Sequence, residues 1–155
     1  MLFIIYLIIV FALVCLDQFS KFYIYSNFAL NESINVINNF FDITYIQNFG
    51  AGFSILQHQR IFLSVVSILA ICILSYLLYT TKKDDTVSKI SYLLIIAGSL
   101  GNLIDRIRLG YVVDFFDFVI FGYDFPVFNV ADCYITIGCF IIIFIVLKES
   151  RNAKN

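Results

Sequence analysis

The stretch IFLSVVSILAICILSYLLY, residues 61–79, carries no charged side chain and is almost entirely apolar. A helix of about 20 apolar residues is long enough to cross the hydrocarbon core of a bilayer, so this stretch predicts a transmembrane helix. The whole chain has the same character, because 61% of its 155 residues are hydrophobic and 14% are charged. Its mean hydropathy is +0.94, whereas soluble domains are about 25% charged. The composition therefore predicts an integral membrane protein.

Four apolar windows are long enough to span a membrane. They cover residues of about 2–24, 59–80, 89–107 and 127–147. No positively charged region precedes the first window and no small-residue cleavage site follows it, so we interpret it as a retained anchor rather than a removable signal. We expect residues 1–155 to form one integral membrane domain.

Positive charges predict the orientation of the spans. Lysines cluster in the loop 81–89, and lysines and arginine occur in the tail 148–155. Because such residues near span ends stay in the cytoplasm, both termini are expected there. The polar ends of the first, third and fourth windows then meet at the extracytoplasmic side.

Two connections are expected on that side. Residues 27–58 contain strand-like residues with partial alternation, which predicts a small β-structure on the outer surface. Residues 108–126 are rich in aromatic side chains and are expected to lie in the membrane interface as an amphipathic segment.

Polar residues converge on the outer ends of the spans: Asp17, Lys21, Asn102, Asp105, Arg106, Asn129 and Asp132. Asp17 and Lys21 are four residues apart, which allows an ion pair on one helix face. Asp105 and Arg106 are adjacent and should not both point inward from a helix, so we expect ion pairing at the interface. Asn102 and Asn129 would be costly in lipid without partners, so they either bond across helices or hold a substrate backbone.

Asp132 and Asp114 are the strongest candidates for a functional site. The span that contains Asp132 is otherwise uncharged over residues 127–147, so its nearest expected partner is another carboxylate. Two close carboxylates share a proton, and such a pair can activate a water molecule while polarising a carbonyl group. The residues alone leave this chemistry and a proton or ion pathway both open, and a non-catalytic scaffold would leave Asp132 unexplained.

Several other classes of function find no support in the sequence. The chain lacks an H-E-x-x-H zinc motif and a G-x-S-x-G esterase motif. His58 and the four scattered cysteines match no zinc spacing. No metal or cofactor is expected, and the absence of a basic run argues against nucleic acid as a partner.

Five motifs in order carry a resemblance to a known family. They are DQFSK (17–21), NFGAGFS (48–54), GNLIDR (101–106), GYVVDF (110–115) and FNVAD (128–132). Together they resemble the lipoprotein signal peptidases, or signal peptidase II, over nearly the whole chain. The resemblance implies an all-α membrane protein of four transmembrane helices, with a small extracytoplasmic β-cradle and a short interfacial helix.

The resemblance also implies an activity and a location. Members of the family are aspartyl endopeptidases of the bacterial inner membrane. They remove signal peptides from prolipoproteins by cutting before a cysteine that carries diacylglyceryl. The expected partners are therefore these signal peptides and membrane lipids, and the family inhibitor globomycin is expected to bind the site.

Site residues carry over motif by motif. Asp114 and Asp132 are implied as the catalytic pair, although the sequence leaves open which of them is protonated. The implied substrate-binding and supporting residues are Asp17, Lys21, Asn48, Gly50, Asn102, Arg106 and Asn129. Cys133 departs mildly from the family pattern, in which a small polar residue follows the catalytic aspartate, and predicts a thiol-sensitive site.

Overall fold

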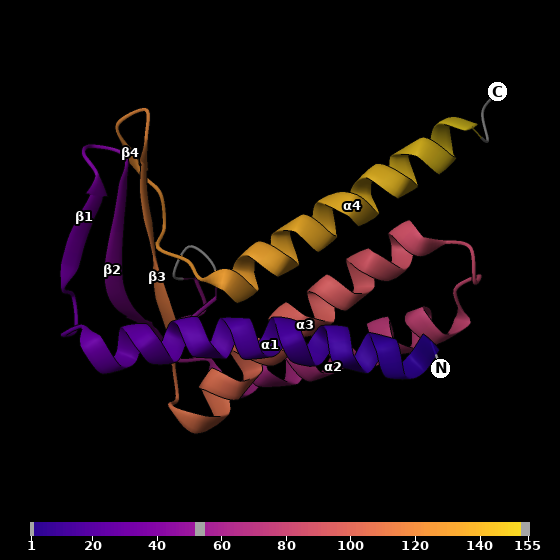
Figure 1. Ribbon diagram of the computed structural model, residues 1–155, viewed down its shortest axis with the longest axis horizontal. Helices are drawn as coiled ribbons and strands as arrows, with labels where there is room; N and C mark the ends of the chain where they lie inside the picture. The colour runs from indigo at the N-terminus through magenta and orange to yellow at the C-terminus, as the bar shows by residue number, and fades with distance from the viewer. Residues whose placement is uncertain (1, 52–54, 153–155) are drawn as a thin grey trace.

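The described part of the chain folds into four long helices and four strands. The computed structural model describes residues 2–51 and 55–152. In chain order the elements are α1 (Leu2–Asn27), β1 (Ser33–Ile37), β2 (Phe41–Asn48), α2 (Arg60–Thr80), α3 (Thr86–Arg108), β3 (Val112–Ile120), β4 (Tyr123–Asp124) and α4 (Val130–Asn152). All four helices are long and apolar enough to cross a membrane. The sheet lies across one end of the helices (Figure 1), which confirms the prediction of four apolar helices with a small β-structure.

Helix α3 forms the centre of the bundle and packs against α1, α2 and α4. In its most apolar window 67% of the residues are buried, compared with 6% to 17% in the other three helices. Small residues allow the close approach of α3 to α4. A Cβ added to Gly98 would overlap the carbonyl oxygen of Ala131, and a Cβ added to Gly138 would lie 2.5 Å from Cγ1 of Ile95.

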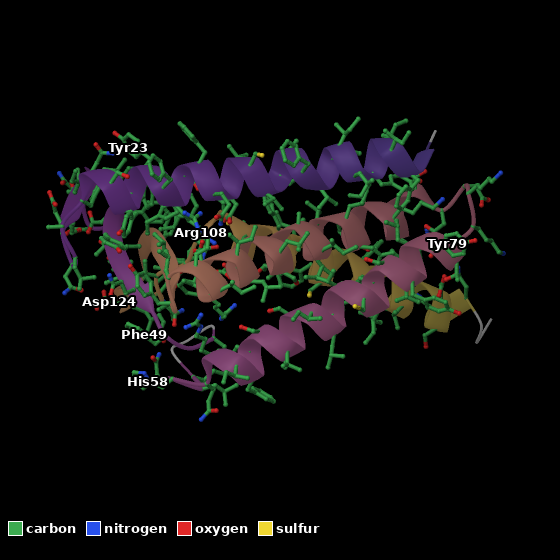
Figure 2. The ribbon with its side chains drawn as sticks, turned by 90° about the horizontal axis from the view of Figure 1, so that it is seen from below. Tyr23, Phe49, His58, Tyr79, Arg108 and Asp124 are labelled. Carbon is green, nitrogen blue, oxygen red and sulfur yellow. The ribbon has the colours of Figure 1, made fainter. Side chains whose placement is uncertain are left out.

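The sheet has the order β1-β2-β3-β4 with antiparallel neighbours. Its first strands come from the connection in which a small β-structure was predicted. The outer end of α1 packs against the sheet, where Ile24 joins a buried cluster with Tyr45, Val113 and Phe115. Figure 2 shows Phe49, His58 and Asp124 at this end of the molecule and Tyr79 at the opposite end.

The amphipathic segment expected over residues 108–126 is not a helix, because this connection forms β3 and β4. The sequence of β3, VVDFFDFVI, consists mostly of β-branched and aromatic residues, which favour strands. It also finds a long partner, since β3 pairs with β2 from Asn48↔Val112 to Phe41↔Phe118. The aromatic residues therefore serve strand pairing rather than one face of a helix.

The start of α4 also differs from the expected start at residue 127. The helix begins at Val130, and Asp132 lies in its first turn. The preceding segment is extended instead, because the backbone N–H groups of Phe115 and Phe116 donate to the carbonyl oxygen of Phe128. Asp132 is consequently at the helix N-terminus and not about 7–8 Å inside the span, the depth that a start at 127 implies.

Candidate active site

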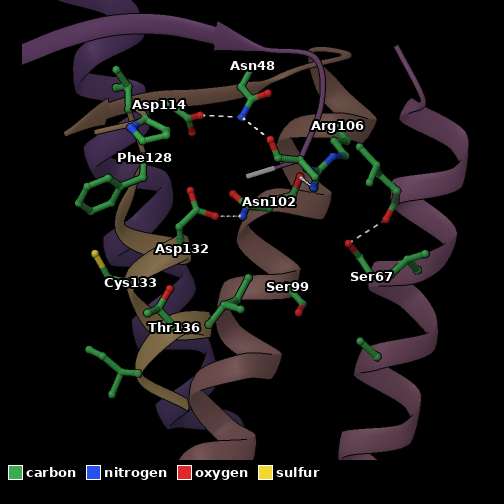
Figure 3. A pocket seen from close by; sticks show the side chains of 18 of the residues that line it. Asn48, Ser67, Ser99, Asn102, Arg106, Asp114, Phe128, Asp132, Cys133 and Thr136 are labelled. Atoms are coloured by element: carbon green, nitrogen blue, oxygen red, sulfur yellow. Dashed lines mark hydrogen bonds between the residues drawn. The ribbon is translucent and has the colours of Figure 1, made fainter. Parts of the chain in front are cut away.

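Two carboxylates from different elements face one cavity at the end of the bundle that carries the sheet. The cavity has a volume of about 680 Å³ and is lined by residues of α2, α3, α4, β2, β3 and the segment before α4. Asp114 reaches it from β3 and Asp132 from the first turn of α4 (Figure 3). The pairing of β3 with β2 and the late start of α4 together bring these side chains to the same cavity.

Reciprocal hydrogen bonds hold Asp132 at the N-terminus of α4. The backbone N–H of Asp132 donates to Oδ1 of Asn129 at 3.0 Å, and the backbone N–H of Asn129 donates to Oδ2 of Asp132 at 3.3 Å. This is the arrangement of a capping box. Nδ2 of Asn102 donates to the second oxygen, Oδ1 of Asp132, at 2.7 Å. The positive end of the helix dipole favours a negative charge at this position.

Asp114 is held by amide side chains and is almost completely buried, with 1% of its surface exposed. Nδ2 of Asn129 donates to Oδ1 of Asp114 at 2.6 Å, and Nδ2 of Asn48 donates to Oδ2 at 2.9 Å. Burial and, to a lesser extent, the neighbouring carboxylate of Asp132 raise the pKa of Asp114 to about 7. Asp114 therefore keeps a proton at pH values where an exposed aspartate has lost its own.

Neither carboxylate forms an ion pair within the described part of the chain, where the ion pairs are those of Lys21. Its Nζ lies 3.0 Å from Oδ2 of Asp17 and 3.2 Å from Oδ2 of Asp105. The predicted pair within α1 is thus confirmed. Asp114 and Asp132 instead receive hydrogen bonds from neutral donors, the side chains of asparagines and a backbone N–H group.

The expectation that Asp105 and Arg106 pair at the interface is wrong, because both side chains are buried. They point to different neighbours, since α3 is surrounded by packing partners. Asp105 faces Lys21 of α1, whereas Nη2 of Arg106 donates to the carbonyl oxygen of Gly50 at 3.0 Å. A second guanidinium nitrogen of Arg106 donates to the carbonyl oxygen of Asn102 at 3.4 Å.

Asp17 joins three helices at one point. Its Oδ1 accepts a hydrogen bond from the backbone N–H of Ala131 at 2.9 Å, which satisfies a free donor in the first turn of α4. Its Oδ2 pairs with Lys21. Gly101 of α3 lies so close that an added Cβ would overlap this oxygen. Asp17 therefore holds the helix start that carries Asp132.

Lys21 also determines the orientation of the Asn102 amide. Its Nζ donates to Oδ1 of Asn102 at 2.9 Å. Because an ammonium group can only donate, the oxygen of the amide must face Lys21, and the NH₂ group then faces Asp132. Nδ2 of Asn129 donates to the same oxygen at 3.3 Å. The two asparagines thus bond across elements, which was one of the two predicted roles.

The loop after β2 is fixed against the site. The backbone N–H of Gly50 donates to Oδ1 of Asn48 at 2.9 Å, and the carbonyl oxygen of Gly50 accepts from Arg106. A side chain at position 50 has no room, because an added Cβ would lie 2.5 Å from the carbonyl oxygen of Ile55. The second glycine of NFGAGFS, Gly52, lies outside the described residues.

The sequence reasoning missed two kinds of residue. Gln18 belongs to the DQFSK motif, and its side chain donates to Asp105 at 3.0 Å and to Asp17 at 3.2 Å. Its position within this motif was the one feature of the sequence that could have identified it. Three small polar side chains, one from each of three helices, line the cavity with no sequence signal of their own: Ser67, Ser99 and Thr136.

Comparison of the sequence with known proteins shows the family of the chain, and comparison of the fold finds similar solved structures. Residues 9–148 match the family model described as Signal peptidase (SPase) II. The chain belongs to the signal peptidase II family. Proteins named lipoprotein signal peptidase are similar over most of their length. The one from Streptococcus thermophilus (strain CNRZ 1066) is 41% identical over 93% of each chain. That from Clostridioides difficile (strain 630) is 41% identical over 95% of this chain and 98% of its own.

Two solved structures, both described as bacterial membrane enzymes determined by the in meso method, have the same fold. The structure at 2.3 Å resolution superposes with a TM-score of 0.89 at 37% identity, covering 95% of this chain and 90% of the other. The structure at 1.9 Å resolution gives a TM-score of 0.84 at 38% identity, covering 92% of each chain. The arrangement of helices and sheet described above is therefore one that solved bacterial membrane enzymes share.

Proposed function

We propose that this protein is a membrane aspartyl endopeptidase that removes signal peptides from diacylglyceryl-modified prolipoproteins. The observation that carries the proposal is the pair Asp114 and Asp132, which face one cavity and, within the described residues, form no ion pair with a cation. Membership of the signal peptidase II family supports the peptidase activity and the class of substrate.

The geometry supports a division of roles in the pair. Asp132 lies at the N-terminus of α4, where a backbone N–H and the helix dipole favour its ionised form. Asp114 keeps its proton up to about pH 7, because of its burial and the neighbouring charge. We assign Asp132 as the base that takes a proton from the attacking water, and Asp114 as the acid that polarises the scissile carbonyl group.

The hydrolysis balances without a further reactant. The water oxygen bonds to the carbonyl carbon while Asp132 takes one proton from the water, and Asp114 donates a hydrogen bond to the carbonyl oxygen. The carbon–nitrogen bond then breaks, and the leaving nitrogen of the lipid-modified cysteine receives the proton held by Asp132. The products are the free signal peptide and the lipoprotein with a new amino terminus.

The remaining polar residues support the pair in this proposal. Asn48, Asn102 and Asn129 orient the carboxylates through their amide N–H groups. Arg106 holds the loop at Gly50 against the site. Asp17 and Lys21 support the site indirectly. Asp17 holds the start of α4, and Lys21 fixes the amide of Asn102. None of the three asparagines can take up a proton, so proton transfer is left to the carboxylates.

The cavity suits a substrate that enters from lipid. It extends from the carboxylates along α2, α3 and α4, where apolar side chains such as Leu63, Val66 and Ile135 line it. A signal peptide could lie there with its scissile bond at the carboxylates and its acyl chains in the bilayer. We place the site at the extracytoplasmic face of the bacterial inner membrane, with both termini in the cytoplasm, because basic residues flank the opposite ends of the helices.

Cleavage of a diacylglyceryl-modified prolipoprotein by the purified protein tests the proposal. The wild type should cut before the lipid-modified cysteine, and Asp114→Asn and Asp132→Asn should each be folded but inactive. The unmodified precursor should remain uncut, and a chelator should have no effect. Globomycin should compete with the substrate in the same assay.

Two outcomes would overturn the proposal. Near-normal cleavage by Asp132→Asn in detergent would show that the chemistry lies elsewhere. Absence of cleavage by a well-folded wild type, together with proton flux in liposomes that depends on Asp114, would favour the proton pathway that the residues alone left open.

A further inference from the structure

The turn between β3 and β4 is an exposed apolar tip at the end of the sheet. Phe121 and Gly122 form a two-residue loop, and the flanking Ile120 and Tyr123 pair with one another. Phe121 is fully exposed to solvent, Tyr123 is 62% exposed and Ile120 is 40% exposed. We use the name β3–β4 tip for residues 120–123.

The backbone of Phe121 is in a conformation that a phenylalanine rarely adopts. Its φ is 51° and that of Gly122 is 78°, so both residues have positive φ, as a type I′ turn requires. This turn type favours Asn-Gly or Asp-Gly, because a bulky side chain is strained at positive φ. The ring of Phe121 is too exposed for packing within the chain to offset this strain, which points to a contact outside the protein.

The tip stands on a rigid aromatic base. The ring of Phe118 stacks on Phe41 with centroids 4.5 Å apart and on Phe128 with centroids 5.8 Å apart. The backbone N–H of Val119 donates to the carbonyl oxygen of Phe40 at 2.9 Å. The turn of β1–β2 therefore braces β3, and Phe121 is held in place rather than free to fold back on the chain.

The tip also overhangs the side of the bundle. Ile24 of α1 packs against Val113 and Phe115 in the first half of β3, so the far end of β3 extends away from α1. Figure 1 shows the β3–β4 turn projecting past the start of α4, at the end of the helices that carries the sheet. Since the four helices give the direction across the membrane, we infer that the tip lies at the outer end of the bundle, over lipid rather than over the helices.

The charges in and around the β3–β4 tip indicate what kind of surface it can contact. Residues 118–123, FVIFGY, carry no charge, and the nearest charged side chains along the sequence are Asp117 and Asp124. Acidic neighbours disfavour attraction to anionic lipids, whereas aromatic and aliphatic side chains favour the boundary between headgroups and acyl chains. We propose that the β3–β4 tip inserts into this boundary of the leaflet on the sheet side, with Phe121 as its anchor.

Insertion would have a structural consequence for the cavity. The chain runs directly from β4 into residues 125–128, which form one wall of the cavity. A tip held by lipid would therefore keep this wall at the membrane surface, beside α4. The lipid contact itself does not depend on the proposed peptidase activity, and its test below needs no turnover.

The chain contains no tryptophan, so a single introduced tryptophan reports on its own environment. Phe121→Trp is reconstituted in phosphatidylcholine bilayers whose acyl chains are brominated either near the headgroup or near the end. Two controls use the same assay. Asp84→Trp lies in the exposed loop between α2 and α3, and Phe140→Trp lies on a lipid-facing part of α4, about 15 Å along the helix from Val130.

Phe121→Trp should show blue-shifted emission and be quenched more strongly by shallow than by deep bromines. Phe140→Trp should show the reverse depth preference, and Asp84→Trp should be quenched by neither. Anionic lipid should not strengthen the quenching of Phe121→Trp. Quenching of Phe121→Trp no greater than that of Asp84→Trp would overturn the proposal, as would blue-shifted emission that brominated lipid does not quench, which would indicate a protein contact.

A second pair of variants tests the anchor. Tyr123→Trp serves as the reporter, with and without Phe121→Asn. Asparagine is favoured at positive φ in a type I′ turn, so Phe121→Asn keeps the hairpin while removing the apolar ring. The reporter should lose most of its quenching in the Phe121→Asn background. Equal quenching in both backgrounds would show that Phe121 does not hold the tip in the membrane.

Discussion

Replacing Lys21 by methionine would remove the cation from a buried cluster of charges. In the wild type, Lys21 lies between the carboxylates of Asp17 and Asp105 and donates to Asn102. Its side chain is 3% exposed, and those of the two aspartates are 0% and 5% exposed. The methionine side chain would keep much of the volume of the lysine but leave two buried carboxylates without a compensating charge.

The expected loss of stability follows from the burial of these groups. Removing one partner of a buried ion pair costs about 3–5 kcal/mol, because the remaining charge stays desolvated. A loss of about 1 kcal/mol lowers Tm by about 2–4 °C in a chain of this size, so Lys21→Met should lower Tm by about 6–20 °C. The deficit should shrink at acid pH, because protonation neutralises the carboxylates that have lost their cation.

Thermal unfolding in one detergent, followed at pH 7 and pH 5, measures the effect. The matched control is the double variant Lys21→Met with Asp105→Asn, which removes one of the two uncompensated charges and keeps the shape of the side chain. It should recover a large part of the lost Tm. A Tm for Lys21→Met within about 2 °C of the wild type would refute the reasoning, since an isolated surface pair gives an effect of that size. A double variant less stable than Lys21→Met would refute it as well.

Three further predictions concern the site. Gly101→Ala should lower both thermal stability and cleavage, because the new Cβ would displace the carboxylate of Asp17, and Gly101→Ser should be at least as damaging in the same two assays. Cleavage should fall as pH rises through about 7, because Asp114 must be protonated to act as the proposed acid and its raised pKa is near this value. A pH–rate profile that stays flat to about pH 9 would contradict this prediction. A bulky thiol reagent should inhibit the wild type but not Cys133→Ser, since Cys133 lines the cavity; equal inhibition of both would place the sensitive thiol elsewhere.

The sequence predicted the helices well, because the signal for a membrane span is local. An uninterrupted run such as residues 61–79 can bury its backbone polar groups only as a helix in lipid. The convergence of polar residues at one end also followed from the sequence, since alternating spans bring the ends of neighbours together. Motif order then pointed to Asp114 and Asp132, and the structure places both side chains at one cavity.

The errors arose where partners distant in sequence decide the outcome. The β-branched and aromatic residues of β3 favour a strand, but an aromatic run of this kind also suits the membrane interface, and the pairing of β3 with β2 over a separation of about 70 residues determines its conformation. The same holds for Asp105 and Arg106. Adjacent residues on a helix point in different directions, and both can be buried only because α3 has other helices or loops on all sides. No local pattern shows that a helix is central.

The four carboxylates of this layer divide according to their partners, which explains why the sequence could not separate them. Asp17 and Asp105 face the ammonium group of Lys21, which forms an ion pair with each of them. Asp114 and Asp132 face amide N–H donors, whose hydrogen bonds a carboxyl group can accept whether or not it carries a proton. A residue that must gain and lose a proton in each turnover requires the second kind of environment. In the proposed mechanism, the position of Lys21 therefore separates the two aspartates that perform acid–base chemistry, Asp114 and Asp132, from the two that join the helices, Asp17 and Asp105.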